Sequence, residues 1–225
     1  MIPVGPSDSI RAWVVYPERS DKAPVVVVVH EIYGLSTWIR SVADQLAADG
    51  YIAVAPDLLT SFHGPTDTLT NDAAVAAIRT LAPEDVQRRL DAAARYGMSL
   101  PAALPRYGIV GFCWGGTTAF AHAVHSPTLA AAVVYYGTSP PTDQLSRVVA
   151  PVLGLYGGSD ARVDATIPPA DSALKALGRT YQPHVFPGAG HGFLRAQDLR
   201  DGANLAAARQ AWPLTISWFR RYLGS

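Results

Sequence analysis

The sequence predicts an α/β fold, in which a mostly parallel central sheet carries helices on both faces. Short apolar runs rich in β-branched residues recur along the chain, and amphipathic helical stretches stand between them. The run Val25–Val29 is unbroken, as in a central strand that is covered on both faces. Of the 225 residues, 49% are hydrophobic and 16% are charged, a composition suited to one well-buried core. We therefore predict a single domain over residues 1–225.

The elements follow in order from local signals. Strands are predicted at 10–16, 25–29, 51–55, 107–110, 130–135, 152–156 and 181–186. Helices are predicted at 36–49, 84–96, 117–125, 168–177 and 204–222. Ser36 or Thr37 can cap the first helix and Gly50 can end it, while Pro83 stands at a first-turn position. Residues 58–82 are irregular, with a weakly helical stretch at 72–80.

Composition excludes several classes of function. The 18 basic and 18 acidic residues balance and form no basic run, so neither nucleic acid nor an anionic membrane surface is an expected partner. The longest apolar run, 24–29, is far too short to span a bilayer. The first residues lack the charged start and apolar core of a signal peptide, and one cysteine fits a reducing cytosol. We predict a cytoplasmic monomer or weak dimer acting on a small molecule; removal of an export signal is the alternative for its location.

Cys113, the only cysteine, lies in a sequence typical of a catalytic nucleophile. Gly111 and Gly115 flank it as Gly-x-Cys-x-Gly, the spacing of the nucleophile elbow of an α/β hydrolase. That turn strains the nucleophile's backbone and needs small neighbours two residues away on either side. The pattern also stands between a predicted strand and a predicted helix. The alternative is a buried structural cysteine.

Two further loops follow predicted strands and carry the other groups that such a nucleophile needs. Asp160 ends the run Gly157-Gly158-Ser159-Asp160, and His191 stands among glycines in Gly188-Ala189-Gly190-His191-Gly192. The order nucleophile, acid, histidine is that of α/β hydrolases. A thiol needs a base to take its proton, and the base needs a carboxylate to fix its tautomer. Because ligands bind beyond the carboxyl ends of parallel strands, we expect these residues to form one site.

The loop after strand 25–29 adds an oxyanion hole and a carboxylate. Such a loop supplies one backbone N–H and the residue after the nucleophile supplies the other, which here means Ile32 and Trp114. Glu31 would then lie near Cys113, where a carboxylate can handle a proton; the alternative is a solvated loop acid. His30 is expected to form structural hydrogen bonds.

At this point the chain resembles the dienelactone hydrolase family over nearly its whole length. The motifs that carry the resemblance are Glu31-Ile32-Tyr33-Gly34, Ala55-Pro56-Asp57-Leu58, Gly111-Phe112-Cys113-Trp114-Gly115-Gly116, Tyr135-Tyr136-Gly137, Gly158-Ser159-Asp160 and Gly190-His191-Gly192-Phe193. The resemblance implies an α/β-hydrolase fold and opening of lactone rings by a Cys-His-Asp triad. It assigns the triad to Cys113, His191 and Asp160.

The resemblance also implies the remaining roles. Glu31 would hold the resting cysteine as a thiol and take its proton when substrate enters. Arg195, four residues after the histidine, would bind a substrate carboxylate. A second arginine comes from the segment over the site, here 58–82, which departs from the family's pattern and offers only Arg79. Apart from the resemblance, the aromatic residue Tyr136 is a candidate for lining a substrate pocket, the alternative being a core residue.

Other chemistries find less support in the sequence. His122 and His125 have a spacing that metals can use, but no cysteine or carboxylate joins them, so we expect no metal and no cofactor. We predict a cysteine hydrolase of small lactones or activated esters. The alternatives are a broader carboxylesterase or thioesterase, a non-catalytic binding protein of the same fold, and a redox sensor, for which a second, resolving cysteine is missing.

Overall fold

The computed structural model describes residues 1–60 and 64–224, which form two compact units, 1–108 and 109–224. Strand β6 (Ala103–Phe112) runs from the first unit into the second. Each unit is built of strands and helices in alternation, and each is described by itself below. The prediction of a single domain stays a prediction.

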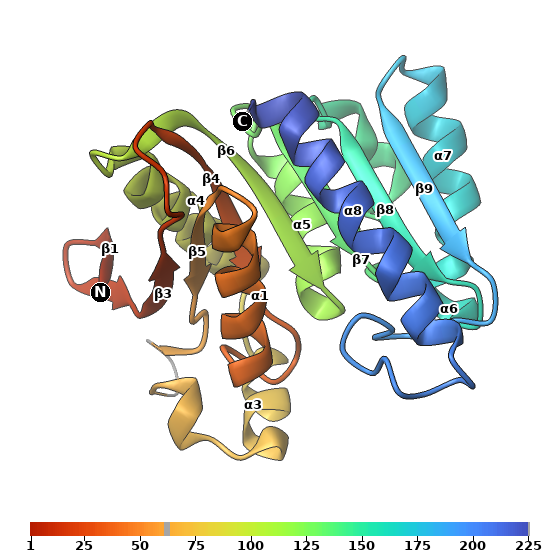
Figure 1. Cartoon of the computed structure of the whole chain (residues 1–225), viewed down its shortest axis with the longest axis horizontal. Helices are drawn as coiled ribbons and strands as arrows, with labels where there is room; N and C mark the ends of the chain where they lie inside the picture. Colours follow the sequence, from red (N-terminus) through yellow and green to blue (C-terminus); the bar gives the residue numbers. More distant parts are fainter. Residues whose placement is uncertain (61–63, 225) are drawn as a thin grey trace. The chain divides into compact units, whose positions relative to one another are not determined.

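The first unit places helices on both faces of its strands. Strand β5 (Ile52–Pro56) pairs in parallel with β4 (Ala23–Val29) and antiparallel with β3 (Ala12–Val15). Every residue of β4 and β5 is buried, as predicted for strands that are covered on both sides. Helix α1 (Thr37–Ala48) lies in front of these strands and α4 (Pro83–Ser99) lies behind them (Figure 1).

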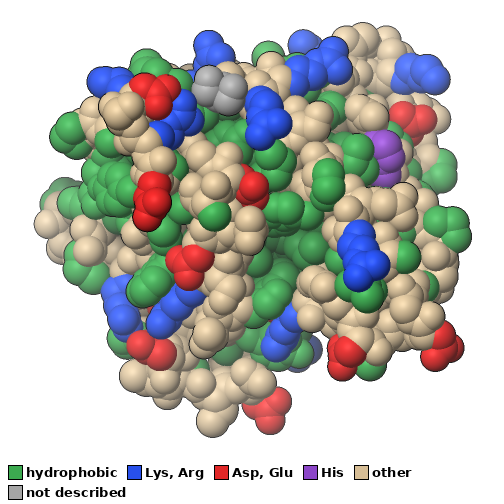
Figure 2. Space-filling model, in the orientation of Figure 1, with side chains coloured by type: hydrophobic (Ala, Val, Ile, Leu, Met, Phe, Trp, Pro, Cys, Tyr) green, Lys and Arg blue, Asp and Glu red, His purple; other side chains and the backbone are tan. Residues whose placement is uncertain are grey.

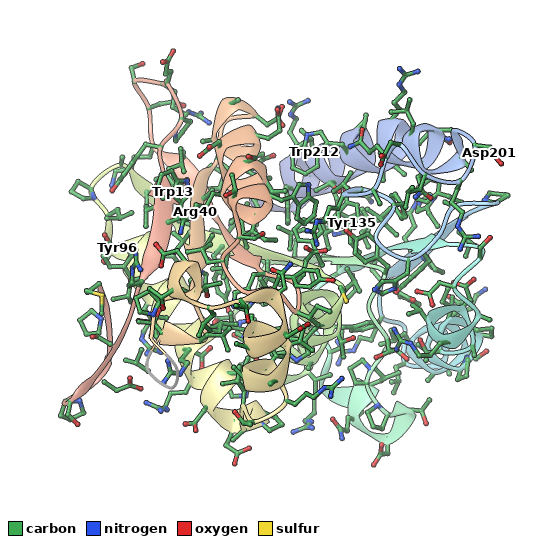
Figure 3. The ribbon with its side chains drawn as sticks, turned by 90° about the horizontal axis from the view of Figure 1, so that it is seen from below. Trp13, Arg40, Tyr96, Tyr135, Asp201 and Trp212 are labelled. Atoms are coloured by element: carbon green, nitrogen blue, oxygen red, sulfur yellow. The ribbon has the colours of Figure 1, made fainter. Side chains whose placement is uncertain are left out.

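Helix α1 begins and ends where the sequence predicts. The Ser36 side chain accepts a hydrogen bond from the Ile39 N–H at 3.4 Å, which satisfies a donor that the first turn leaves over. The helix ends before Gly50, whose φ of +102° suits glycine. At the outer strand of this unit the Arg40 guanidinium lies 5.5 Å from the ring centre of Trp13 (Figure 3).

Two local features of the first unit were not predicted. Strands β1 (Ile2–Gly5) and β2 (Asp8–Ile10) form an antiparallel hairpin at the start of the chain. The Arg89 side chain, 1% exposed, donates from Nη2 to Asp8 Oδ2 at 3.1 Å and ties this hairpin to α4. These contacts join residues far apart in sequence, and neither residue has a distinctive local pattern.

Within its described residues, the segment 58–82 includes the short helices η1 (Thr66–Thr68) and α3 (Asn71–Ile78). The second overlaps the predicted stretch at 72–80. Asp57, 2% exposed, accepts the Thr66 N–H at 2.9 Å and the Thr66 hydroxyl at 2.5 Å. This buried carboxylate therefore fixes the start of the segment; its residues 61–63 lie outside the described part.

The second unit is a parallel sheet between two layers of helices. Strand β8 (Val152–Gly157) pairs in parallel with β7 (Ala131–Tyr135) on one side and β9 (Tyr181–Phe186) on the other. Helix α8 (Ala203–Leu223) covers one face, while α5 (Trp114–His125) and α7 (Ile167–Ala176) cover the other (Figure 1).

Inside this unit Tyr135 reaches from β7 toward α8, where its hydroxyl lies 2.7 Å from Thr215 Oγ1 (Figure 3). Burial raises the pKa of Tyr135, so its hydroxyl stays protonated. Two short helices, η2 (Thr142–Arg147) and α6 (Ala161–Asp164), were not predicted.

Among the described residues, no helix is long and apolar enough to cross a bilayer. Figure 2 shows side chains of both signs scattered over the face in view, which agrees with the net charge of zero. The mostly parallel pairing, with β3 antiparallel, confirms the predicted fold class.

Candidate active site

Cys113 occupies a strained turn between β6 and α5. Its backbone has φ 57° and ψ −117°, a conformation that non-glycine residues rarely adopt. A Cβ added at Gly111 would lie 1.9 Å from the Gly115 carbonyl oxygen, so the turn can close only because position 111 is glycine. The Cys113 N–H donates to the Tyr135 carbonyl oxygen at 3.1 Å. Cys113 is partly exposed and stands at the N-terminus of α5.

Asp160 and His191 form a hydrogen-bonded pair. His191 Nδ1 lies 2.5 Å from Asp160 Oδ2, and the carboxylate side chain is 9% exposed against 36% for the imidazole. A carboxylate oxygen can only accept, so Nδ1 carries the proton and Nε2 is left to act as a base. This is the arrangement that a general base in a triad requires.

Close backbone contact aligns the loops that carry these two residues. A Cβ added at Gly157 would lie 2.5 Å from the Gly190 carbonyl oxygen. The Ser159 N–H donates to the Ala189 carbonyl at 2.9 Å, and the Gly158 N–H donates to the Phe186 carbonyl at 2.9 Å. The glycines in both loops therefore permit the approach that pairs Asp160 with His191.

Tyr136 stands where the nucleophile loop and the histidine loop meet. The Cys113 N–H donates to the carbonyl oxygen of Tyr135, the residue before Tyr136. The ring centre of Tyr136 lies 5.2 Å from that of His191 in an edge-on contact. Tyr136 adopts φ 40° and is 1% exposed. Its predicted role in substrate binding stays a prediction, and its ring also contacts those of Phe112 and Phe193.

The glutamate loop belongs to the first unit. Glu31 is 5% exposed, so it is not the solvated loop acid of the alternative interpretation. The buried His30 side chain lies between two backbone groups, with Nδ1 2.7 Å from the Glu31 carbonyl oxygen and Nε2 3.2 Å from the Leu58 nitrogen. Burial lowers the pKa of His30, and the neutral ring makes both bonds. Ile32, the predicted oxyanion-hole donor, lies in the turn that follows.

The remaining predicted site residues differ in their settings. Trp114 is the first residue of α5, where N–H groups point out of the helix as an oxyanion hole requires. Arg195 is exposed in the loop after His191, and its N–H donates to the Gly192 carbonyl at 2.9 Å. Arg79 is exposed at the C-terminal cap of α3 in the first unit.

Two residues near the pair were not predicted. Asp164, at the end of α6, has its pKa raised by burial and by the charge of Asp160, and its Oδ1 is buried with no hydrogen-bond partner. Asn204, at the start of α8, is 1% exposed and bonds to the histidine loop. Neither stands in a recognisable motif. Within residues 1–60 and 64–224, no group of three metal-ligating side chains gathers.

Comparison with known proteins identifies the family of the chain. The model of the dienelactone hydrolase family matches residues 10–223. A Salmonella typhimurium protein, provisionally named a carboxymethylenebutenolidase, is 35% identical over 230 residues, covering 96% of this chain and 84% of its own. A Bradyrhizobium protein, provisionally named a 2-oxo-3-(5-oxofuran-2-ylidene)propanoate lactonase, is 30% identical over 96% of this chain and 91% of its own.

Solved structures point the same way. A protein from Klebsiella pneumoniae, provisionally named a dienelactone hydrolase, superimposes with a TM-score of 0.86 at 30% identity, over 98% of this chain and 97% of its own. The fold is therefore that of an α/β hydrolase. Within that class the chain belongs to the dienelactone hydrolase family, and it is a hydrolase.

Proposed function

We propose that the protein hydrolyses small lactones or activated carboxylic esters through a thioester on Cys113. The observation that carries the proposal is the Asp160–His191 pair at 2.5 Å, held beside the Tyr135-Tyr136 turn to which the Cys113 backbone is bonded. The lactonase name of the Bradyrhizobium relative supports the substrate class. Deacylation then falls to the base at His191 Nε2.

The proposed reaction has two halves. Cys113 Sγ attacks the carbonyl carbon, and backbone N–H groups of Trp114 and Ile32 stabilise the resulting oxyanion. The C–O bond breaks, and the leaving oxygen takes from the Glu31 carboxyl the proton that the Cys113 thiol gave up on attack; in a lactone this oxygen stays on the acyl group as a hydroxyl. Water then loses a proton to His191 Nε2 and attacks the thioester, and His191 passes this proton to the departing sulfur, which returns the thiol and releases the acid.

A comparison of Cys113 variants tests this proposal. The wild type, quenched early with an aryl ester, should carry the mass of one acyl group, and Cys113→Ala should carry none. Cys113→Ala should lose roughly a thousandfold or more in kcat/KM with an unchanged circular dichroism spectrum. Cys113→Ser tests the thiol itself. Retention of most activity in the alanine variant contradicts the proposal, because hydrolysis would then not depend on the Cys113 thiol.

The same panel separates two substrate classes. We propose comparing a carboxylated lactone, a neutral lactone and simple aryl esters. A lactonase of the family type should prefer the carboxylated lactone, because Arg195 can pair with its carboxylate. Faster turnover of simple aryl esters or thioesters would favour the broader esterase or thioesterase.

We also propose that Glu31 is the proton acceptor for the Cys113 thiol. A nearby carboxylate disfavours a second negative charge, so the resting cysteine would be a thiol. Such a cysteine resists oxidation, which follows thiolate character. When substrate is bound, the carboxylate would accept the thiol proton. The 5% exposure of Glu31 supports a role other than that of a solvated acid.

The variant Glu31→Gln keeps the size of the side chain and removes its charge. It should slow acylation, because the proton acceptor is lost, and should make resting Cys113 easier to alkylate. The measurement is the pH dependence of iodoacetamide labelling in the two proteins. Superimposable curves would leave Glu31 without this role.

A further inference from the structure

Asn204 joins the two ends of the loop that carries His191 and Arg195. Its Oδ1 accepts the Gly190 N–H at 2.9 Å, and its Nδ2 donates to the Ala196 carbonyl oxygen at 2.7 Å. The side chain is 1% exposed, so water cannot readily replace either bond. Gly190 directly precedes His191, and Ala196 directly follows Arg195. The amide group of Asn204 therefore fixes the backbone next to both His191 and Arg195.

The chain before Asn204 is shaped to present this side chain. Arg200, Asp201 and Gly202 all have left-handed backbones, with φ of 63°, 49° and 85°. Two of these residues are not glycine, so their conformation costs free energy that the surrounding structure must offset. The turn they form leads directly into α8, and Asn204 lies in its first turn. The anchor thus belongs to a rigid 21-residue helix, while its targets belong to a loop.

The loop that carries His191 and Arg195 is a compact turn, and it has to be attached to the layer of helices. The N–H groups of Arg195 and Ala196 both donate to the Gly192 carbonyl, at 2.9 and 3.0 Å, so residues 192–196 close on themselves. On its other side the histidine loop is bonded to the loop that carries Asp160, where the Ser159 N–H donates to the Ala189 carbonyl oxygen at 2.9 Å. The bonds from Asn204 tie this assembly to α8.

We propose that Asn204 is a positioning residue for the histidine loop. Through Gly190 it keeps the His191 ring against Asp160, and through Ala196 it sets where the Arg195 side chain begins. A neutral amide suits this task, because it offers an acceptor and a donor together and adds no charge beside the pair. The kinetic part of this inference rests on the proposed function.

Three variants test the proposal. Asn204→Ala removes both bonds. Asn204→Asp keeps the volume and an acceptor for the Gly190 N–H, but it loses the donor to Ala196. Thr215→Val is the matched control, because it removes a buried hydrogen bond from the same helix, that to Tyr135 at 2.7 Å.

The expected results separate positioning from stability. Asn204→Ala should lower kcat on a neutral aryl ester by roughly 10- to 100-fold, the size of effect that a displacement of about 1 Å produces. Asn204→Asp should keep most of kcat on that ester but raise KM for a carboxylated one, since the Arg195 end is released. Thr215→Val should lower the melting temperature and leave kcat within about twofold, because the hydrogen bonds of the Thr215 hydroxyl go to Tyr135 and to the Ala211 carbonyl and not to the loop.

A readout that needs no substrate completes the test. Amide hydrogen exchange at Gly190 should be faster in Asn204→Ala than in the wild type or in Thr215→Val. The downfield NMR signal of the proton between His191 Nδ1 and Asp160 Oδ2 should broaden in the same variant. A wild type without hydrolytic activity would refute the proposed function, whereas these two measurements would still judge Asn204. Equal kcat in Asn204→Ala and Thr215→Val, or unchanged exchange at Gly190, would overturn the inference.

Discussion

Replacing Asp160 with asparagine removes the charge beside His191 and keeps the shape of the side chain. The wild-type contact is short, 2.5 Å from Oδ2 to Nδ1, and the carboxylate is 9% exposed. The imidazole becomes a cation each time it accepts a proton, and the carboxylate stabilises that cation. Asparagine offers a weaker acceptor, or a donor that forces the wrong tautomer on His191.

The magnitude follows from the strength of this bond. A hydrogen bond to a charged group contributes about 1.5–3 kcal/mol. At about 1.4 kcal/mol for each factor of ten in rate, loss of the charge alone should lower kcat by roughly 10- to 100-fold. A reversed tautomer would add to this, so the expected loss lies between about 10²- and 10⁴-fold.

Rapid-mixing kinetics with an aryl ester can measure this loss in acylation and deacylation separately. The melting temperature should show that the variant is folded. Asp164→Asn is the matched control, because it removes a carboxylate four residues away that does not bond to His191. The reasoning is refuted if Asp160→Asn lowers kcat by less than about threefold. It also fails if the losses of Asp160→Asn and His191→Ala multiply in the double variant, since members of a triad act as a unit.

Two further predictions concern charge. Arg195→Ala should raise KM for carboxylated lactones by about fivefold, because an exposed ion pair contributes about 1 kcal/mol to binding. KM for neutral aryl esters should stay unchanged. An equal rise in KM for both substrates would mean that Arg195 has only a structural role. Asp164→Asn should raise the melting temperature at pH 7, because burial and the charge of Asp160 raise the pKa of Asp164 and make its ionised form costly in the folded state. This gain in melting temperature should vanish as pH falls below the ordinary pKa of aspartate, where the wild-type carboxyl is protonated in both the folded and the unfolded state. A gain that persists at acid pH would contradict this explanation.

Local patterns carried most of the predicted fold. A β-branched run identified the central strand because a strand that is covered on both faces must be apolar at every position, as in Val25–Val29. Boundaries were less accurate: α5 begins at Trp114 rather than at 117, since a helix that starts in a strained turn has no capping side chain to mark it. The elbow at Cys113 was recognisable because its steric demand falls on Gly111 and Gly115, which lie within two residues of it.

Contacts between distant residues could not be predicted in the same way. Asn204 bonds to Gly190, 14 residues earlier, and in the sequence it looked like an ordinary residue at a helix start. Arg89 pairs with Asp8 across 81 residues, and nothing nearby distinguished it from the exposed Arg88. Such partners depend on how the elements pack, and a single sequence does not contain that information in any local window.

The glutamate loop, which carries Glu31, shows how sequence and structure complement each other. The sequence singled out Glu31, and the structure adds that His30 fixes the backbone of that same residue, with Nδ1 2.7 Å from its carbonyl oxygen. The carbonyl can only accept and the Leu58 N–H can only donate, so His30 is neutral with its proton on Nδ1. These two bonds hold the loop through backbone groups. A change from carboxylate to amide at position 31 alters neither of these backbone groups, so both bonds should persist in Glu31→Gln.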